Sequence, residues 1–377
     1  MPSDRTLTAI GLMAGTSLDG VDAAVLRTDG MGLTEAGASG FTPYDRDTKI
    51  KVRRAIKAAL EGRDGATDIA EAADAVTSAH IAAVRDLLDK ARLRAPDIDV
   101  IGFHGQTILH RSPVDAATPG RTWQIGSGRT LADELRIDVV EQLRSADVAA
   151  GGEGAPLLPA YHAALAQGLD RRGPLAVLNL GGVANITFVP LNPEGPDLLA
   201  FDCGPGNGLI DSWVEARTGQ AMDEGGALAS TGAVHEDVVR LMALNPFLRR
   251  PAPKSLDRYD FKLKPAEGLS AADGAATLTA FTAECVARSV RLLPAPPERW
   301  IVCGGGRHNP VLMEALRARL NGEVVPSEAV GWAGDDVEAQ GFAYLAVRSL
   351  KKLPITWPGT TRAPRALTGG TYQAKPI

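Results

Sequence analysis

Two acidic residues in the middle of the chain, Asp147 and Glu153, lie in a glycine-dense stretch that reads ADVAAGGEGAP. A carboxylate held beside a hydroxyl group or a water molecule can remove its proton, so either residue could act as a general base. Ordering a segment with so many glycines costs conformational entropy, so a functional loop is a better explanation for it than a simple connection between elements. The alternative is that both are solvated loop charges, and the local sequence does not decide between these possibilities.

The turn of a predicted β-hairpin is a second candidate site. Residues 8–28, TAIGLMAGTSLDGVDAAVLRT, read as two apolar strands joined by small and polar residues. Glycines bring backbone N–H groups close to an anion, and Thr16 and Ser17 add hydroxyl donors. Asp19 and Asp22 would fit beside a phosphate if Mg²⁺ lay between the negative groups. The same residues could equally form a tight hairpin in which they only cap and turn the chain.

A third candidate site follows the short buried strand predicted at 98–102, where the sequence continues FHGQTILHR. We expect His104, Gln106 and His110 to gather in a loop beyond the strand end, where open α/β sheets bind ligands. This pattern favours a substrate pocket over a metal site, because the two histidines lack a third ligand at close spacing. A polar loop with two hydrogen-bonded histidines is the alternative.

Three glycine turns recur in the second half of the chain. LNLGGVANIT repeats the hairpin design, while FDCGPGN and CGGGRHN each join a predicted strand to a predicted helix. A glycine turn before a helix N-terminus presents backbone N–H groups to an anion. The P-loop pattern GxxxxGK[ST] is absent, and FDCGPGN does not match the dinucleotide fingerprint GxGxxG with its following acidic residue. The turns therefore predict another kind of phosphate site.

Composition limits the class of protein. The chain has 377 residues, enough for two lobes, and its net charge of −5 argues against binding to nucleic acid. Its three cysteines are far apart, which excludes a CxxC pair and is typical of a reducing compartment. A polar start and the lack of an apolar run of about 18 residues predict neither a signal peptide nor a membrane span.

Apolar periodicity predicts the elements that must position these residues. Helices are expected at 45–60, 69–92, from 159 onward, 230–248, 271–293, from 309 onward and 335–350. His80 lies on the apolar stripe of the second helix, and we expect it to be a packed, hydrogen-bonded core residue. The basic, proline-rich stretch 246–259 is expected at the surface. The segment after Lys351 has no period and is expected to be mobile.

In their order, these motifs resemble the phosphate-1, phosphate-2 and adenosine motifs of the sugar kinase, Hsp70 and actin ATPase superfamily. A narrower resemblance is to the anhydro-N-acetylmuramic acid kinase family, carried by GLMAGTSLDGVD, GFHGQT, TWQIG, ADVAAGGEGAPLLPAYH, LNLGGVANIT, FDCGPGN and GWAGDDVEAQGFAYLA. It implies an α/β fold of two duplicated ribonuclease-H-like lobes with an ATP cleft between them. The implied parts are an N-terminal lobe at 1–172, a C-terminal lobe at 173–336, and a helix and tail at 337–377 that return toward the N-terminal lobe.

The resemblance also implies a cytoplasmic, homodimeric enzyme of peptidoglycan recycling. Such an enzyme opens 1,6-anhydro-N-acetylmuramic acid with water and phosphorylates O6 with ATP, giving N-acetylmuramic acid 6-phosphate. Matched motif by motif, Asp147 is the catalytic base and Asp19 lies near Mg²⁺ through water. In such an enzyme, we expect His104 and Gln106, at the third candidate site, to bind the amino sugar. The implied ATP-binding residues are Gly15, Thr16, Ser17, Leu18, Asp19, Gly20, Val21, Asp22, Gly181, Gly182, Asn185, Asp202, Gly204, Gly206, Asn207, Gly304 and Gly305.

Two stretches depart from the family pattern. GGEGAP stands where GGQGAP is usual, which places a second negative charge, that of Glu153, near the proposed base. PKSLDRYDF replaces a more typical Ser-Thr-Gly-Arg order, so we assign no sugar contact to that stretch. Two other functions are left open: a kinase of the same superfamily that acts on another sugar, and a non-catalytic regulator with the ATPase fold.

Overall fold

The computed structural model describes residues 5–15, 17–113, 118–192, 197–256 and 260–376. The chain forms two compact units: unit 1 comprises Met1–Gly168 with Asp336–Ile377, and unit 2 comprises Leu169–Asp335. The boundaries expected from the sequence were 172/173 and 336/337. Unit 1 is discontinuous, because the chain leaves it and returns for its last segment. Among the described residues, every helix is too short or too polar to cross a membrane.

Unit 1 is built on a mixed sheet with the strand order β3-β2-β1-β4-β6-β12, and β5 pairs with β4. β1 and β2 form an antiparallel hairpin, β4 lies parallel to β1, and β6 lies parallel to β4. The turn after β1, the second half of β4 and the segment after β6 therefore gather at one edge of the sheet. The strands are β1 (Leu7–Ala14), β2 (Gly20–Thr28), β3 (Thr34–Pro43), β4 (Val100–Arg111), β5 (Arg121–Ile125), β6 (Val139–Glu141) and β12 (Thr371–Gln373).

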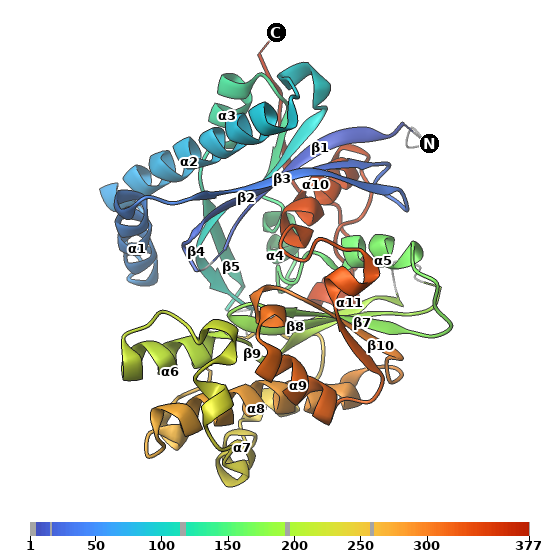
Figure 1. Ribbon diagram of the computed structural model, residues 1–377. Helices are drawn as coiled ribbons and strands as arrows, with labels where there is room; N and C mark the ends of the chain where they lie inside the picture. Colours follow the sequence, from blue (N-terminus) through green and yellow to red (C-terminus); the bar gives the residue numbers. More distant parts are fainter. Residues whose placement is uncertain (1–4, 16, 114–117, 193–196, 257–259, 377) are drawn as a thin grey trace. The chain divides into compact units, whose positions relative to one another are not determined.

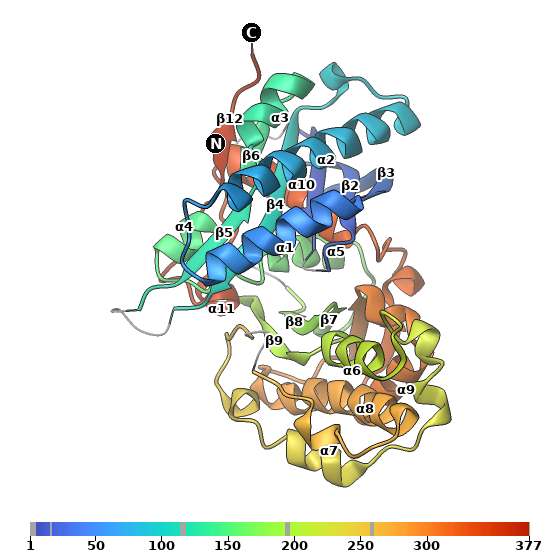
Figure 2. The same ribbon diagram turned by 90° about the vertical axis from the view of Figure 1, so that its left-hand side faces the viewer.

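Helices cover both faces of this sheet, α1 and α2 on one and α10 on the other (Figures 1 and 2). α10 packs closely because Gly11 and Gly102 have no side chain: an added Cβ at either would lie 1.7 or 2.1 Å from the α10 backbone. As expected, α1 begins after Asp45, whose carboxylate accepts a hydrogen bond from Thr48 N at 2.7 Å. The helices of unit 1 are α1 (Arg46–Leu60), α2 (Thr67–Ala91), α3 (Gly128–Leu135), α4 (Ser145–Ala149), α5 (Pro159–Gln167), α10 (Val337–Leu350) and α11 (Pro358–Thr361).

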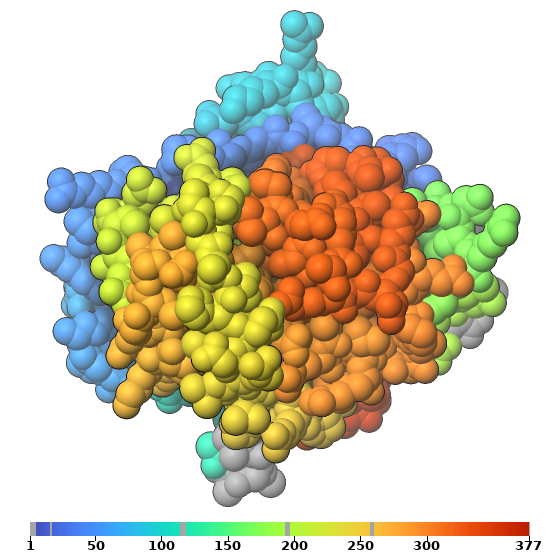
Figure 3. All heavy atoms as spheres, turned by 60° about the horizontal axis from the view of Figure 1, so that its bottom comes forward, coloured from blue at the N-terminus to red at the C-terminus, as the bar shows by residue number. Residues whose placement is uncertain are grey.

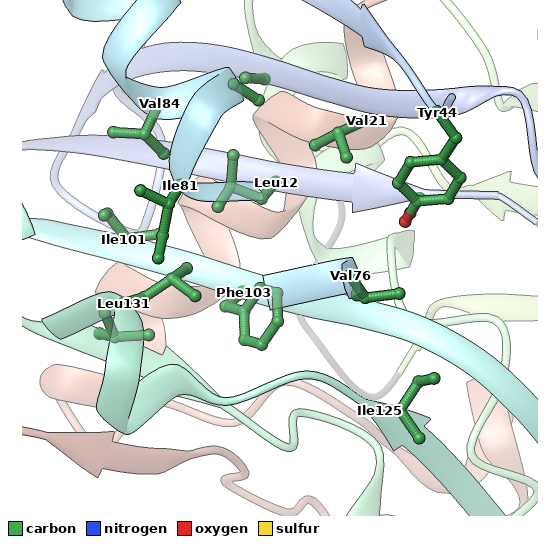
Figure 4. Close-up of a cluster of buried hydrophobic side chains, with 14 of the residues drawn as sticks. Leu12, Val21, Tyr44, Val76, Ile81, Val84, Ile101, Phe103, Ile125 and Leu131 are labelled. Carbon is green, nitrogen blue, oxygen red and sulfur yellow. The ribbon is translucent and has the colours of Figure 1, made fainter. Parts of the chain in front are cut away.

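The hydrophobic core of unit 1 lies between the sheet and α2. Figure 4 shows Leu12 and Val21 of the hairpin beside Phe103 of β4 and Val76 of α2. His80 is fully buried in the same region, with its Nδ1 2.7 Å from Val76 O and its ring edge-on to Phe103. Burial lowers the pKa of His80 to about 4, so the ring is neutral. The expectation of a packed core histidine is confirmed.

The segment after Lys351 is ordered, so the expectation of a mobile tail is wrong. It contains α11, and its strand β12 pairs antiparallel with β6. Ile355 and Trp357 are buried, with 1% and 6% of their surface exposed. The elements are too short to show a helical or strand period in the sequence, and single buried side chains anchor them instead.

Unit 2 repeats the design of unit 1. Within its described residues, the sheet has the order β9-β8-β7-β10-β11, with antiparallel β7–β8 and β8–β9 pairs and parallel β7–β10 and β10–β11 pairs. This order and orientation match β3-β2-β1-β4-β6, so the chain has two duplicated ribonuclease-H-like lobes, as the resemblance implied. The strands of unit 2 are β7 (Leu175–Leu180), β8 (Val183–Val189), β9 (Leu199–Pro205), β10 (Arg299–Cys303) and β11 (Glu323–Pro326).

Helices α8 and α9 pack on this sheet, where Val286 and Leu316 share a buried cluster with Ile186 and Trp300. On the face that Figure 3 shows, segments that follow α6, coloured yellow to orange, lie at the surface. The helices are α6 (Gly208–Thr218), α7 (Glu236–Met242), α8 (Ala271–Ser289) and α9 (Pro310–Arg319).

Two expectations for unit 2 are wrong. The helix predicted at 230–248 is reduced to α7, because separate 3₁₀ turns form before it at Ala229–Thr231 and after it at Pro246–Arg249. The stretch 246–259, expected at the surface, is partly core: Lys254 is 1% exposed and its Nζ donates to Phe247 O at 2.9 Å. Burial lowers the pKa of Lys254 to about 8. The long aliphatic stem lets a basic residue fill apolar space, which composition alone does not reveal.

Candidate functional site

Asp147 lies in the first turn of α4, just after β6, and not in a loop as expected. Its side chain is only 2% exposed. Thr361 Oγ1 donates to its Oδ1 at 2.7 Å, and Gly154 N donates to its Oδ2 at 2.7 Å. Each carboxylate oxygen therefore has one fixed donor, and this sets the plane of the group. The helix has five residues, too few for a recognisable apolar period.

The glycine stretch wraps closely around Asp147. Gly152 N donates to Asp147 O at 2.9 Å, and an added Cβ at Gly152 would lie 2.2 Å from Asp147 Oδ2. Gly154 has φ +71°, a left-handed conformation that favours glycine. The glycines therefore allow the loop to reach the carboxylate that it holds.

Glu153 is also buried, with 1% of its surface exposed, so it is not a solvated loop charge. Its backbone N donates to Thr361 O at 2.6 Å, and its Oε1 lies 3.3 Å from Nη1 of Arg362. Its Oε2 has no hydrogen-bond partner within the described residues. The arginine compensates the charge that distinguishes GGEGAP from the usual motif.

His104 and Gln106 lie on β4, which continues to Arg111, so the expected loop is wrong. The strand continues because its second half leaves β1 and pairs with β5. His104 Nδ1 lies 2.8 Å from Gly105 O, and Arg144 Nε donates to its Nε2 at 3.1 Å. Because arginine can only donate, Nε2 accepts and the proton is on Nδ1. Burial and the Arg144 charge hold the pKa of His104 well below its usual value.

Gln106 connects β4 to the hairpin turn. The residue is fully buried, and its Nε2 donates to Gly15 O at 3.1 Å. Its Oε1 has no hydrogen-bond partner among the described residues. A buried amide oxygen without a donor is costly, so a ligand hydroxyl or amide that donates to it would gain binding energy. His110, the third polar residue predicted for this site, also lies on β4, and its Nδ1 is 3.2 Å from Thr122 Oγ1.

The hairpin turn is held by its own polar groups. Ser17 Oγ donates to Asp19 Oδ1 at 2.8 Å, and Gly20 N donates to the same oxygen at 3.0 Å. Leu18 has φ +58°, and its N lies 3.4 Å from Gly15 O. Thr16, which was also assigned to ATP, lies outside the described residues.

Of the other hairpin residues, Gly20, Val21 and Asp22 belong to β2, so the turn itself is shorter than the motif. Val21 is fully buried in the core. Across the described part of the chain, no group of three His, Cys, Asp or Glu side chains is arranged to hold a metal ion. The assignment of Asp19 to Mg²⁺ through water stays a prediction.

In unit 2, three glycine turns meet after β7, β9 and β10. Asn207 N donates to Gly181 O at 2.7 Å, and Gly206 N and Gly208 N both donate to Gly182 O at 3.1 Å. An added Cβ at Gly206 would lie 2.3 Å from Gly181 O. Asn207 Nδ2 also donates to Leu180 O at 3.2 Å. The turns thus form a layer of bare backbone at the carboxyl ends of parallel strands, where α/β sheets bind nucleotides.

The other residues predicted for this site have structural contacts. Asn185 of β8 pairs in register with Asp202 of β9. Asp202 N donates to Lys254 O at 2.9 Å, and Asp202 Oδ2 accepts from Leu256 N at 2.8 Å, so this residue fixes the buried stretch beside it. Gly204 lies against Cys285, because an added Cβ would be 2.6 Å from the cysteine Cβ.

Gly304 and Gly305 provide a matched pair of variants. Gly304 has φ +75° and ψ 171°, and an added Cβ would lie 2.4 Å from Asn179 Oδ1 and 2.8 Å from Leu180 O. We expect Gly304→Ala to lower the free energy of unfolding by about 2–4 kcal/mol, from backbone strain and overpacking. Gly305→Ala meets no atom closer than 3.8 Å and is expected to change it by less than about 0.5 kcal/mol. Urea titration without nucleotide measures both, and equal losses would contradict this account of the turn.

Sequence reasoning missed three residues around Asp147: Arg144, Thr361 and Arg362. Arg144 Nη1 donates to Gly154 O at 2.7 Å, so it joins the glycine stretch to His104. Thr361 and Arg362 come from the segment that was expected to be mobile. Neither residue belongs to a glycine or acidic motif, so only the folded structure identifies them as neighbours of the candidate base.

Comparison with known proteins places the chain in a family. The family model described as "Anhydro-N-acetylmuramic acid kinase" matches residues 7–374. A relative of that name from Rhizorhabdus wittichii is 54% identical, over 96% of this chain and 97% of its own length. One from Rhodospirillum rubrum is 51% identical, over 98% and 95%.

Two solved structures show a distant similarity. The activator of the 2-hydroxyisocaproyl-CoA dehydratase from Clostridium difficile with bound ADPNP is 14% identical, with a TM-score of 0.45, and covers 92% of this chain and 96% of its own. A ROK family glucokinase from Streptomyces griseus in complex with glucose and AMPPNP is 15% identical, with a TM-score of 0.40, and covers 90% and 99%.

Proposed function

Because the chain belongs to the anhydro-N-acetylmuramic acid kinase family, we propose that it opens 1,6-anhydro-N-acetylmuramic acid with water and phosphorylates O6. The product would be N-acetylmuramic acid 6-phosphate, formed in cell-wall recycling. The observation that carries the proposal within the structure is the buried carboxylate of Asp147, whose two oxygens are each held by one donor. A fixed carboxylate in a water-poor environment suits a general base.

In the proposed reaction, Asp147 removes a proton from the water that attacks the anomeric carbon. The bond from that carbon to O6 breaks, and O6 takes the γ-phosphoryl group as ADP leaves. Phosphoryl transfer depends mainly on positioning and on neutralising charge, so it requires no protein nucleophile. Gln106 Oε1, which lacks a partner among the described residues, supports a contact with a sugar hydroxyl or amide.

His104 is a weaker candidate for direct sugar contact. Both of its ring nitrogens already have partners, Gly105 O and Arg144 Nε. A sugar that approached Nε2 would have to displace Arg144. We therefore propose that His104 acts mainly by holding Arg144 and, through it, the glycine stretch.

ATP is the proposed phosphoryl donor, with Mg²⁺ as its usual companion. The bare backbone of the turns in unit 2 fits a nucleotide, since an added Cβ would meet no atom within 4 Å at Gly182 and none closer than 3.8 Å at Gly305, so these turns leave their backbone open to a ligand. In unit 1, Ser17 and Asp19 would supply a hydroxyl and a carboxylate near the phosphates and Mg²⁺. When bound, Mg²⁺ would neutralise phosphate charge. The resemblance further leads us to propose a cytoplasmic homodimer, which sedimentation and cell fractionation would check.

An assay with the anhydro sugar, ATP and Mg²⁺ in ¹⁸O-labelled water tests the function. We expect ADP release and a product that gains one water and one phosphoryl group, with the label on the anomeric hydroxyl. Phosphorylation of ordinary hexoses but not of the anhydro sugar would favour a different sugar kinase. Nucleotide binding without turnover of any sugar would favour a non-catalytic regulator.

A further inference from the structure

The last helix of unit 1, α11, lies directly against Asp147 and its loop. Thr361 is fully buried, its Oγ1 donates to Asp147 Oδ1, and its carbonyl oxygen accepts from Glu153 N. The next residue, Arg362, pairs with the Glu153 carboxylate at 3.3 Å. Three contacts from two adjacent residues therefore hold both the proposed base and the stretch that wraps around it.

We propose that Thr361 is a positioning residue for Asp147, and this inference rests on the proposed function. The Gly154 N–H alone would fix one carboxylate oxygen and leave the group free to rotate about that contact. The Thr361 hydroxyl fixes the second oxygen, so the carboxylate plane has one orientation. Each oxygen keeps a further acceptor position, and one of these receives the proton of the attacking water.

The hydroxyl of Thr361 is not needed to build α11. The helix is closed by Thr361 N, which donates to Trp357 O at 3.1 Å, and by Thr360 Oγ1, which accepts from Trp357 N at 3.0 Å. The Thr361 hydroxyl contacts Asp147 instead. Its loss should therefore affect the orientation of the base more than the fold of the segment.

Thr361→Val, which keeps the shape and removes the donor, is expected to lower kcat by about 10- to 100-fold, with KM for sugar and ATP changed less than about twofold. Thr361→Ser keeps the hydroxyl and is expected to retain kcat within about threefold. Thr356→Val is the matched control, because Thr356 is buried in the same segment and its Oγ1 has no partner among the described residues. It should keep wild-type kcat.

Crystal structures of the wild-type protein and the Thr361→Val variant supply a readout that does not depend on turnover. We expect the Asp147 carboxylate to be rotated or to occupy more than one orientation in the variant. Wild-type kcat and an unmoved carboxylate in that variant, or equal losses for Ser and Val, would overturn the proposal. Failure of the wild-type protein to use the anhydro sugar would instead overturn the proposed function, and the carboxylate orientation would still decide the role of Thr361.

Discussion

Asparagine in place of Asp147 is expected to lower turnover of the anhydro sugar by about a thousandfold, because the amide cannot accept the proton of water. The amide can keep the local contacts. Its oxygen would accept from Gly154 N, and its NH₂ group would donate to a reoriented Thr361 hydroxyl. Folding should therefore be retained, and the binding of a non-hydrolysable ATP analogue, measured by calorimetry, should stay within about threefold of wild type.

Glu153→Gln is the matched comparison for this experiment. It removes the other buried carboxylate of the stretch and restores the GGQGAP form usual in the family. Since Glu153 Oε1 faces Arg362 and not Asp147's donors, we expect the variant to keep most of its turnover. If Asp147→Asn turned over normally and Glu153→Gln did not, the base would be Glu153 and our assignment would be wrong.

Acid is expected to destabilise unit 1 strongly, because three of its histidines are buried in the neutral form. Burial lowers the pKa of His80 to about 4 and that of His162 to about 3, and burial with the Arg144 charge lowers that of His104 well below its usual value. In the unfolded chain these groups take up protons below about pH 6.5. The stabilisation from these neutral rings is therefore fully present above that pH. It is lost as pH falls toward the folded pKa values, by up to about 4 kcal/mol at pH 5 for His80 and His162 together, and His104 adds to the loss in the same direction.

Urea titrations between pH 7.5 and pH 5 measure this effect, with amide hydrogen exchange to separate the units. Peptides from α2 and α5 of unit 1 should lose protection more steeply than those from α8 of unit 2. His162→Gln is the informative variant, since it should reduce the slope of the free energy of unfolding against pH by about 1 kcal/mol per pH unit. A stability that stays flat down to pH 5 would mean that water reaches these rings in the folded protein.

The sequence was most informative where a repeated pattern or a special turn specifies the backbone. The hairpin at 8–28, the helix after Asp45 and the turns at Gly181, Gly206 and Gly304 are present as expected. Each depends on local chemistry: a cap, an apolar stripe or a glycine where a side chain would collide. Patterns of this kind involve residues that are close together in the chain, so a single sequence is enough to recognise them.

Features that depend on distant partners were not predictable in this way. β4 continues through His104 because β5 pairs with it. α11 is ordered because the Thr361 hydroxyl donates to Asp147 and the Thr361 carbonyl oxygen accepts from Glu153 N. Thr361 and Asp147 are 214 residues apart in sequence, so no window of the sequence could relate them. For the same reason Lys254 was expected at the surface, although it is buried in unit 2 with its Nζ over the ring of Phe247.

The discontinuity of unit 1 has a consequence for protein synthesis. A chain leaves the ribosome from its N-terminus, so β1, β2 and β4 emerge long before α10, which covers one face of their sheet, and before α11, which holds Asp147. Unit 2 is contiguous and can fold in the meantime. A nascent or prematurely terminated chain would therefore expose the α10-facing side of the β1–β4 sheet, and chaperones bind such exposed surfaces. It would also lack the contact that orients Asp147, so we expect it to have no catalytic activity.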